Sequence, residues 1–436
     1  MLYNHKTYRL NTKSLVKKSL FISFIGVGLS IIGFYNDPRF FHSYLVAYLF
    51  FATLSLGGLF FVLAHHMFGA DWSIPIRRFA ENLMILIPLI AILSLPIMFK
   101  IDYLYVWTDP IEVNGEHYSN LKLKDIHSDQ YNHDSYEHNH DNHELNFWEY
   151  HPTMIAKKAY LNKGFFFLRL SIYFLVWFLL AFRLYYGSIK QEKNKDKEKL
   201  KKISAVGMFL FAITGSFFGF DMIMSLDPTW FSTMFGIYIF AGSYYGCIAL
   251  MILISIYLRR NLILIDEINE KHYANLGKIA FTFTVFWAYI AGFQYYIIWY
   301  ANLPEEINWF IQRWTGPFKY VSLVLIFGHF VIPFSLLIFN KIKRNKSVLT
   351  AMGTLMLIMH WLDLYWMVMP NYFRDKHGYI SYESLGLLSV ISWTDFSLLL
   401  AMGGLFMAIY WSLFKKFPIV PYNDSAFDQS ITNEES

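Results

Sequence analysis

The sequence predicts an all-α integral membrane protein with ten transmembrane helices. Its 436 residues are 56% hydrophobic and 20% aromatic, with a mean hydropathy of +0.34. A helix needs about 20 largely apolar residues to cross ~30 Å of hydrocarbon. Continuous apolar runs such as Phe165–Leu168 and Met251–Ile254 exclude the alternating pattern of a barrel strand. The expected spans cover residues 19–36, 43–66, 79–99, 165–187, 203–224, 233–257, 276–300, 318–340, 348–369 and 388–413.

The first span resembles a secretory signal peptide in one respect, because it follows the basic residues Lys17 and Lys18. However, no small-residue cleavage site precedes the polar turn Tyr35–Pro38. A signal peptide would carry such a site. We therefore interpret residues 19–36 as a retained transmembrane helix.

The distribution of lysine and arginine predicts the orientation of the chain. If the N-terminus is cytoplasmic, the inner segments carry 24 of these residues and the short outer loops carry 5. Cationic residues in short loops favour the cytoplasmic side. We therefore expect both termini in the cytoplasm. The outer cations are Arg39, Arg313, Lys319, Arg374 and Lys376.

Three segments outside the spans have distinct compositions. The long outer loop 100–164 contains a polar tract with six histidines, and such tracts can bind metal. Their irregular spacing favours a solvated or partner-contacting loop instead. Residues 302–319 are typical of an amphipathic segment at the outer interface, and the acidic tail 422–436 is expected to be disordered. The six histidines are His127, His133, His138, His140, His143 and His151.

A single cysteine, Cys247, limits the redox chemistry that this chain can support. One thiol cannot hold an iron–sulfur cluster, form an internal disulfide or attach a c-type haem through Cys-x-x-Cys-His. We therefore expect no covalently bound cofactor. Any such redox centre must belong to a partner subunit.

A matched spacing in the fifth and ninth spans indicates an internal repeat. Asp221 precedes Pro228 by seven residues, and Asp363 precedes Pro370 by the same interval. Four spans separate the two, as a parallel duplication of four-helix bundles requires. The hypothesis places Asp221 and Asp363 at equivalent positions.

Ionisable side chains inside spans are costly and usually face a bundle interior, a cavity or a partner charge. Carboxylates and imidazoles are suited to accept protons when a quinol is oxidised. His360 and Asp363 are three residues apart and so share one helical face. The candidates for a proton path or a quinone pocket are Glu81, Arg169, Asp221, His329, His360, Asp363 and Asp395.

Each candidate also has a structural explanation. Arg169 and Asp221 can neutralise each other between the fourth and fifth spans. Asp395 can cap its helix or lie at the interface, and Glu81 can form a surface pair with Arg77 or Arg78 at i,i+4 or i,i+3. His360 and Asp363 can form a hydrogen-bonded pair that locks the eighth span, which carries His329, to the ninth.

At these residues the chain resembles the membrane subunits of alternative complex III, in particular its F-subunit family. That family is related to the NrfD/polysulfide-reductase membrane anchors. The similarity covers most of the chain outside the histidine-rich loop. It rests on three stretches, which are FFGFDMIMSLDPTWFSTMFG at residues 217–236, HFVIPF at 329–334 and HWLDLYWMVMP at 360–370.

The resemblance implies two four-helix bundles, helices 2–5 and 6–9, flanked by helices 1 and 10 in a bacterial inner membrane. It also implies a complex that oxidises menaquinol and passes electrons to haem c and iron–sulfur clusters on partner subunits. The expected partners are an NrfD-like paralogue, a multihaem cytochrome c, an iron–sulfur protein, the lipid bilayer and, in some complexes, a terminal oxidase. No nucleic acid is expected.

Three other functions remain open from the sequence. Ten helices with charges near the membrane midplane also suit a secondary transporter, although paired Gly/Pro interruptions in corresponding spans are not evident. A b-type cytochrome could use His329 and His360 as axial ligands. A purely structural membrane scaffold would need none of the candidate residues.

Overall fold

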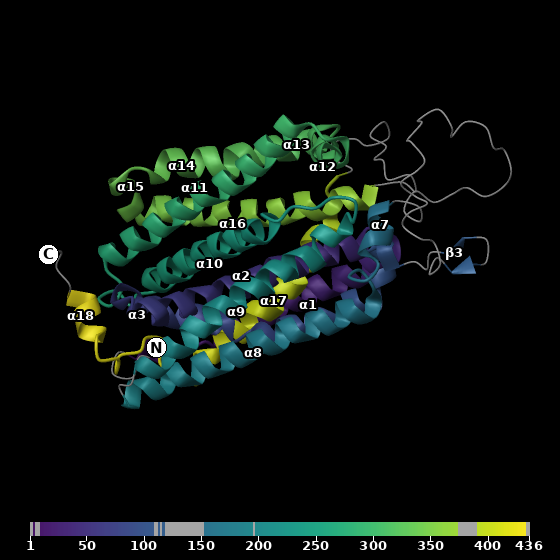
Figure 1. Cartoon of the computed structure of the whole chain (residues 1–436). Helices are drawn as coiled ribbons and strands as arrows, with labels where there is room; N and C mark the ends of the chain where they lie inside the picture. The colour runs from purple at the N-terminus through teal and green to yellow at the C-terminus, as the bar shows by residue number, and fades with distance from the viewer. Residues whose placement is uncertain are drawn as a thin grey trace.

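The chain is an all-α, multi-pass membrane protein (Figure 1). The computed structural model describes residues 3–4, 9–108, 112–113, 116–117, 152–194, 197–373 and 390–432. Within these ranges, ten helical segments are long and apolar enough to cross a membrane, which confirms the expected spans. They are Lys13–Asn36, Phe40–Phe68, Asp71–Phe99, Lys163–Asn194, Glu198–Leu226, Phe235–Arg260, Glu270–Ala301, Phe318–Leu337, Lys346–Phe373 and Trp393–Leu413.

The first half of the chain forms the first five spans and their connections. Its helical elements are α1 (Lys13–Asn36), α2 (Phe40–Phe68), η1 (Asp71–Ser73), α3 (Ile74–Met84), α4 (Ile87–Leu93), α5 (Leu95–Phe99), η2 (Ile101–Tyr103), η3 (Val106–Thr108), α7 (Pro152–Lys157), α8 (Lys163–Asn194), α9 (Glu198–Met222) and η6 (Met224–Leu226). Two-residue strands pair antiparallel, β1 (Tyr3–Asn4) with β2 (Arg9–Leu10) and β3 (Glu112–Val113) with β4 (Glu116–His117).

The second half forms the other five spans and a short helix after the last one. Its elements are α10 (Phe235–Arg260), α11 (Glu270–Ala301), α12 (Pro304–Trp314), α13 (Phe318–Leu325), the π-helical η7 (Ile326–Val331), α14 (Ile332–Leu337), α15 (Asn340–Arg344), α16 (Lys346–Val368), η8 (Met369–Phe373), α17 (Trp393–Leu413) and α18 (Phe427–Thr432).

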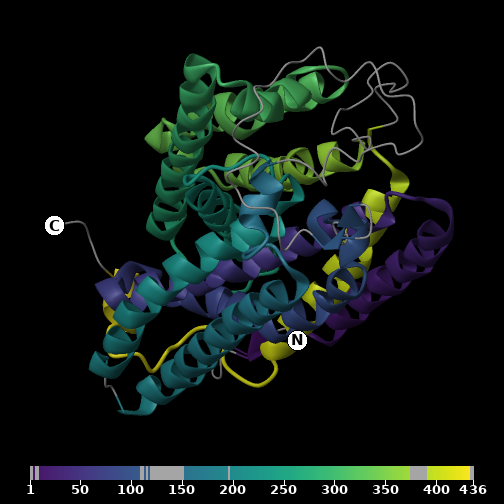
Figure 2. The same cartoon turned by 45° about the vertical axis from the view of Figure 1, so that its right-hand side comes forward.

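The helix contacts match the expected grouping into two bundles. In the first, α2, α3–α5, α8 and α9 pack around one another, and in the second α10, α11, α13–α14 and α16 do so. The leading helices α2 and α10 pack against each other and are the most buried spans. Figure 2 shows α1 beside α17 at the edge of the molecule, and α17 packs on α2.

The helix bundle has two ends, one on each side of the membrane, and each is named by the elements that lie there. At the terminal end, α1 begins, α17 ends and α18 lies (Figure 1). At the opposite end, called the loop end, α7 and α12 lie. An even number of spans places the start of α1 and the end of α17 at the same end. Which side of the membrane this end faces stays a prediction.

Prolines interrupt the third and eighth spans, a feature that the sequence analysis did not expect. Pro88 and Pro96 divide the third span into α3, α4 and α5, because each lacks the N–H that the helix needs. In the eighth span Pro333 follows the π-helical turn that contains His329. Under the repeat, the third span corresponds to the seventh. The interruptions therefore do not occupy corresponding positions.

The acidic tail is folded as far as residue 432, so the prediction of a disordered segment from 422 onward is wrong for this part. Ile419 and Val420 are fully buried, and α18 packs on η1 and α3 with Phe427 buried. Its few apolar residues are spread among polar ones, so average composition hides them. Residues 433–436 lie outside the described residues, as do the six histidines of the long loop.

The amphipathic segment expected at residues 302–319 contains α12, which packs on α13 at the loop end of the second bundle. Its Arg313 is fully buried. The guanidinium donates to the carbonyl oxygens of Trp366 at 3.1 Å and Met367 at 2.9 Å. This cation therefore ties α12 to the end of α16, although the sequence analysis placed it in an outer loop.

Helix α1 turns only small residues into its buried face against α17. Ser23 Oγ donates to Ala401 O at 2.8 Å, and a Cβ at Gly26 would lie 2.2 Å from Ala401 N. Small residues let membrane helices approach closely where hydrophobic burial offers no gain. The buried residues of α1 are Ser19, Ser23, Gly26, Ser30 and Gly33.

We predict that Gly26→Ala destabilises the protein, because the added methyl overlaps the backbone of α17. Overpacking of this kind costs about 1–3 kcal/mol. Gly28→Ala is the matched control, since nothing lies within 4 Å of a Cβ there. Thermal unfolding in detergent should show a lower midpoint for Gly26→Ala than for Gly28→Ala. Equal midpoints would contradict the close contact.

Candidate functional site

The candidate residues of the sequence analysis separate into three buried polar groups and one helix cap. Arg169 and Asp221 form a pair at the loop end of the first bundle. Asp363, His360 and His329 lie in the second bundle, around the aromatic rings of Tyr238 and Trp287; we call these five residues the acid–aromatic cluster. Glu81 lies in a group of ion pairs at the terminal end, and Asp395 caps α17.

Asp221 is held by four hydrogen bonds from three side chains. Arg169 donates from Nε to Oδ2 and from Nη2 to Oδ1, both at 2.9 Å. Tyr160 donates to Oδ1 at 2.8 Å and Tyr173 to Oδ2 at 2.7 Å. Bidentate pairing to a guanidinium is the strongest fixed geometry for a carboxylate. The expected neutralising pair is therefore present, and its saturated carboxylate is suited to anchor α8 to α9 rather than to exchange protons.

Asp363 has the opposite environment. The hydroxyl of Tyr238 donates to Oδ1 in a short hydrogen bond, and Trp287 Nε1 donates to Oδ2 at 3.1 Å. Both donors are neutral. The side chain is buried, and among the described residues no lysine, arginine or histidine forms an ion pair with it. Such a carboxyl group can hold either protonation state without breaking a salt bridge.

His329 lies in the π-helical turn, between two parallel aromatic rings. Its ring centroid is 3.8 Å from that of Trp287 and 4.3 Å from that of Tyr245. Neither ring nitrogen has a hydrogen-bond partner among the described residues. π-Helical turns occur frequently at functional sites. The turn thus holds a fully buried imidazole inside the second bundle.

A hydroxyl group of α2 holds the ring of His360. Thr53 Oγ1 lies 2.8 Å from His360 Nε2. The same hydroxyl is within hydrogen-bond distance of Leu49 O and Phe50 O on its own helix. Thr53 therefore joins α16 to α2, and the other ring nitrogen of His360, Nδ1, has no partner within the described part of the chain.

Two glycines of α10 make room for the His360 ring. A Cβ at Gly246 would lie 2.7 Å from Cδ2 of His360, and one at Gly242 would lie 3.2 Å from Nδ1. The same point at Gly242 lies 4.0 Å from Oδ2 of Asp363. Gly242 therefore lets the His360 ring approach α10 closely, beside the carboxyl group of Asp363.

The expected trio of His329, His360 and Asp363 is brought together, but not by direct hydrogen bonds among its members. Trp287 provides the link, since it stacks on His329 and donates to Asp363. Sequence reasoning missed Trp287 and Tyr238. They lie 76 and 125 residues from Asp363, in a chain with 13 tryptophans and 31 tyrosines, so no local signal separates them from lipid-facing aromatics.

Glu81 forms the expected i,i+4 and i,i+3 pairs, but they are buried and not on the surface. Its Oε1 lies 3.1 Å from Arg77 Nε, and its Oε2 accepts from Arg78 Nη1 at 2.7 Å. Arg78 also pairs with Glu192 of α8, and Arg77 pairs with Asp424 at 2.9 Å. These five residues form a continuous chain of charges, which we call the terminal-end ion chain.

Asp395 takes the capping role that the sequence analysis left open. It stands at the third position of α17 and accepts from the backbone N–H of Ser392 at 2.8 Å. Ser392 Oγ in turn accepts from the backbone N–H of Thr394. This capping box satisfies backbone donors at the helix start.

An apolar cavity of about 180 Å³ lies between α2, α9 and α10. Its serines, Ser216 and Ser243, donate to carbonyl oxygens of their own helices. The lining holds no ionisable side chain. The residues present therefore fit a hydrocarbon chain and do not fit a quinol head group, which needs a proton acceptor.

A haem between His329 and His360 does not fit the residues either. The His360 ring fills the space left by Gly242 and Gly246, and the His329 ring is stacked on both faces. Within the described ranges, no group of three or more His, Cys, Asp or Glu side chains could hold a metal ion.

Comparison of the chain with protein-family models and with curated protein sequences gives no match.

We predict that Asp221→Asn lowers the free energy of unfolding by about 3–5 kcal/mol, because Arg169 is then buried without its counter-charge. The double variant Arg169→Met/Asp221→Leu removes both charges and should cost less than the single variant. Thermal unfolding in detergent measures both. A single variant as stable as the native chain would show that the pair does not anchor α8 to α9.

Proposed function

We propose that this chain is a membrane subunit of a respiratory quinol-oxidising complex of the alternative complex III type, and that it contributes a transmembrane proton route. One observation carries the proposal. Asp363 is a buried acid without a cationic partner among the described residues, beside two imidazoles with free nitrogens. Buried ionisable groups of this kind mark proton relays in membrane proteins.

The motif resemblance supports the same assignment. His329, His360 and Asp363 all fall within the stretches that resemble the complex III membrane subunits. In such a complex, menaquinol would be oxidised beside a paralogous subunit, because the apolar cavity of this chain does not suit a quinol head group. Haem c and iron–sulfur clusters on partner subunits would carry the electrons.

The geometry indicates how the cluster handles a proton. As a carboxylate, Asp363 is stabilised by the Tyr238 hydroxyl and the Trp287 N–H. As an acid, it can release its proton toward the ring of His360, which borders the same position at Gly242 and whose Nδ1 has no partner among the described residues. The free nitrogens of His329 extend the polar region on the other side of Trp287.

The proposed placement is a bacterial inner membrane with both termini in the cytoplasm. The support is the excess of lysine and arginine in the segments at the terminal end. In this orientation the loop end faces the periplasm, where haem-bearing partners would dock. The long loop 100–164 is the expected contact.

The other functions have less support. A secondary transporter would place its broken helices in corresponding spans of the two repeats, and the interruptions here fall in the third and eighth. A b-type cytochrome needs space that His329 and His360 do not leave. A structural scaffold differs from a proton route in one measurable respect, which is the effect of neutralising Asp363.

We predict that the complex carrying Asp363→Asn assembles but loses at least nine-tenths of its quinol-driven proton release. The amide keeps the shape and can accept from Tyr238, yet it cannot ionise. Asp395→Asn is the matched control, because it neutralises a buried acid that caps α17 and lies outside the acid–aromatic cluster. Proton release is followed with a pH indicator in proteoliposomes. If the complex with Asp363→Asn released protons at the native rate, the proton route would be contradicted and a structural scaffold would be the better assignment.

We also predict that the chain purified in mild detergent carries multihaem cytochrome c and iron–sulfur partners. The partners would show as haem absorption bands and as additional chains by mass spectrometry. Because Cys247 alone cannot hold these groups, any such signal must come from partners. Isolation of the chain alone, with native yield and stability, would favour a transporter.

A further inference from the structure

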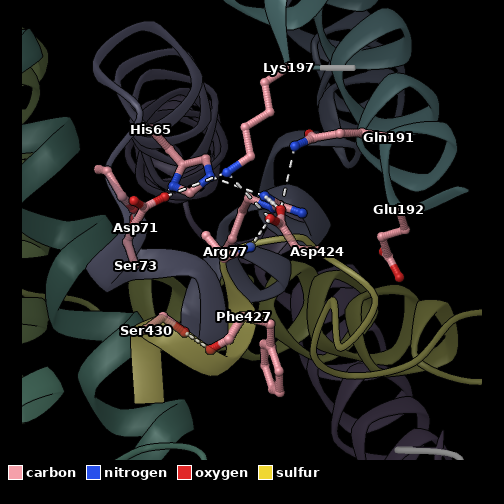
Figure 3. Close-up of polar contacts among 12 residues, drawn as sticks. His65, Asp71, Ser73, Arg77, Gln191, Glu192, Lys197, Asp424, Phe427 and Ser430 are labelled. Carbon is pink, nitrogen blue, oxygen red and sulfur yellow. Dashed lines mark hydrogen bonds and ion pairs between the residues drawn. The ribbon is translucent and has the colours of Figure 1, made fainter. Parts of the chain in front are cut away.

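The C-terminal segment lies across a polar cavity at the terminal end of the first bundle (Figure 3). The cavity has a volume of about 190 Å³. It borders α2, α3, α8 and the start of α9, and Asp424 is the residue that the C-terminal segment adds to its wall. The segment is thus part of the cavity rather than a tail beside it.

Asp424 is held from three elements. Its Oδ2 accepts from Arg77 Nη1 at 2.9 Å and lies 3.4 Å from Gln191 Nε2. Its Oδ1 lies 3.6 Å from Lys197 Nζ and accepts from the backbone N–H of Ala426 at 3.2 Å. One carboxylate therefore joins α3, α8 and the residue before α9.

Arg77 transmits this contact to His65. The same Nη1 that donates to Asp424 lies 3.1 Å from Nε2 of His65. A guanidinium only donates, so Nε2 is the acceptor and the proton of His65 is on Nδ1. That proton goes to Ser73 Oγ at 2.7 Å, which itself donates to Ala70 O at 2.9 Å. Asp424 thus positions Arg77 so that His65 is neutral in one defined tautomer.

The cavity wall also carries buried polar atoms without partners among the described residues. They are His66 Nε2, Gln191 Oε1 and Arg77 Nη2. All three residues line the cavity. An unpaired buried polar group costs about 1–3 kcal/mol. A cavity of this size with donors and acceptors on several sides is suited to ordered water.

We propose that this cavity is a water-filled vestibule for proton uptake, and that residues 419–432 are its lid, with Asp424 as a positioning residue for Arg77 and His65. The inference rests on the proposed proton route, and the vestibule would be the place where protons enter that route. The vestibule opens onto the terminal-end ion chain through Arg77, and His65 is its first titratable neighbour on α2.

The lid stays closed over the working pH range. Burial raises the pKa of Asp424, but the charges of Arg77 and Lys197 and the hydrogen bonds from Arg77 and the Ala426 N–H together outweigh it, so the pKa lies below the usual range of an aspartic acid. The groups that face Asp424 are Arg77, His66, Lys197 and Gln191. A lowered pKa means that docking is stabilised above the pKa of a free aspartate, about 3.9. It weakens only as the pH falls through the folded value.

Cysteine labelling tests the lid without reference to turnover. Gln191→Cys places a thiol in the cavity wall, and the native Cys247 is fully buried, so the parent chain is the unlabelled control. A membrane-impermeant methanethiosulfonate reagent is applied to the detergent-solubilised complex, where membrane sidedness has no effect. The variants are Asp424→Asn and a chain that ends at Pro421, each carrying Gln191→Cys.

We expect labelling at least ten-fold faster with Asp424→Asn or with the chain that ends at Pro421. A chain that ends at Thr432 is the matched control, since it loses Glu434 and Glu435 but keeps the docked segment. Its rate should equal that of the full chain at each pH between 6 and 8, where both rise only with the ionised fraction of the introduced thiol, whose ordinary pKa is about 8.5. Equal labelling rates for the chains that end at Pro421, Thr432 and Ser436 would show that residues 419–432 are not a lid.

The pH profile of turnover tests the role of Asp424 in uptake. With Asp424→Asn, Arg77 keeps only Glu81 as its counter-charge, so the potential in the cavity becomes more positive and the alkaline limb of turnover should move toward acid. Asp424→Glu should restore the native profile. Faster labelling with an unchanged profile would overturn the vestibule, whereas native turnover by Asp363→Asn would overturn the proposed function and leave the labelling result intact.

Discussion

The hydrocarbon of a bilayer offers no hydrogen-bond partner, and this constraint organises the interior of the protein. Each polar side chain within the spans must find its partner on the protein or on water. Arg169 and Asp221 join α8 to α9, whereas Asp363 joins α16 to α10 through Tyr238 and to α11 through Trp287. The polar residues therefore mark both the helix contacts and the places where chemistry is available.

The two acids that share a spacing to proline satisfy this constraint in opposite ways. Asp221 is saturated by a guanidinium and two tyrosines, so loss of its charge breaks an ion pair. Asp363 accepts from two neutral donors only. If the two bundles arose by duplication, one copy became an anchor and the other an exchangeable site. Their superposition and these roles stay predictions, whereas the difference in their hydrogen-bond partners is a feature of the structure.

Sequence predicted the spans well, because a long apolar run is a local property that hydropathy measures directly. It also gave the pair Arg169–Asp221 and the cap at Asp395, each as one of the alternatives that it left open. It could not find Tyr238 or Trp287, since aromatic residues are abundant in every span and only the packing of distant helices selects these two. The fold of the tail was missed for a related reason. A few apolar residues such as Phe427 are enough to dock α18 when the bundle supplies a complementary surface.

Helix α2 borders both polar regions, since Thr53 contacts His360 and His65 contacts Arg77. Twelve residues separate the two contacts, or about 18 Å at ~1.5 Å per residue. Between them the backbones of α2 and α10 are in close contact, because a Cβ at Gly57 would lie 2.4 Å from Ser243 O. A continuous water column along this path would dissipate a membrane potential worth ~2.3 kcal/mol per charge at 100 mV. In the proposed proton route, the close contact at Gly57 would be the barrier between the vestibule and Asp363.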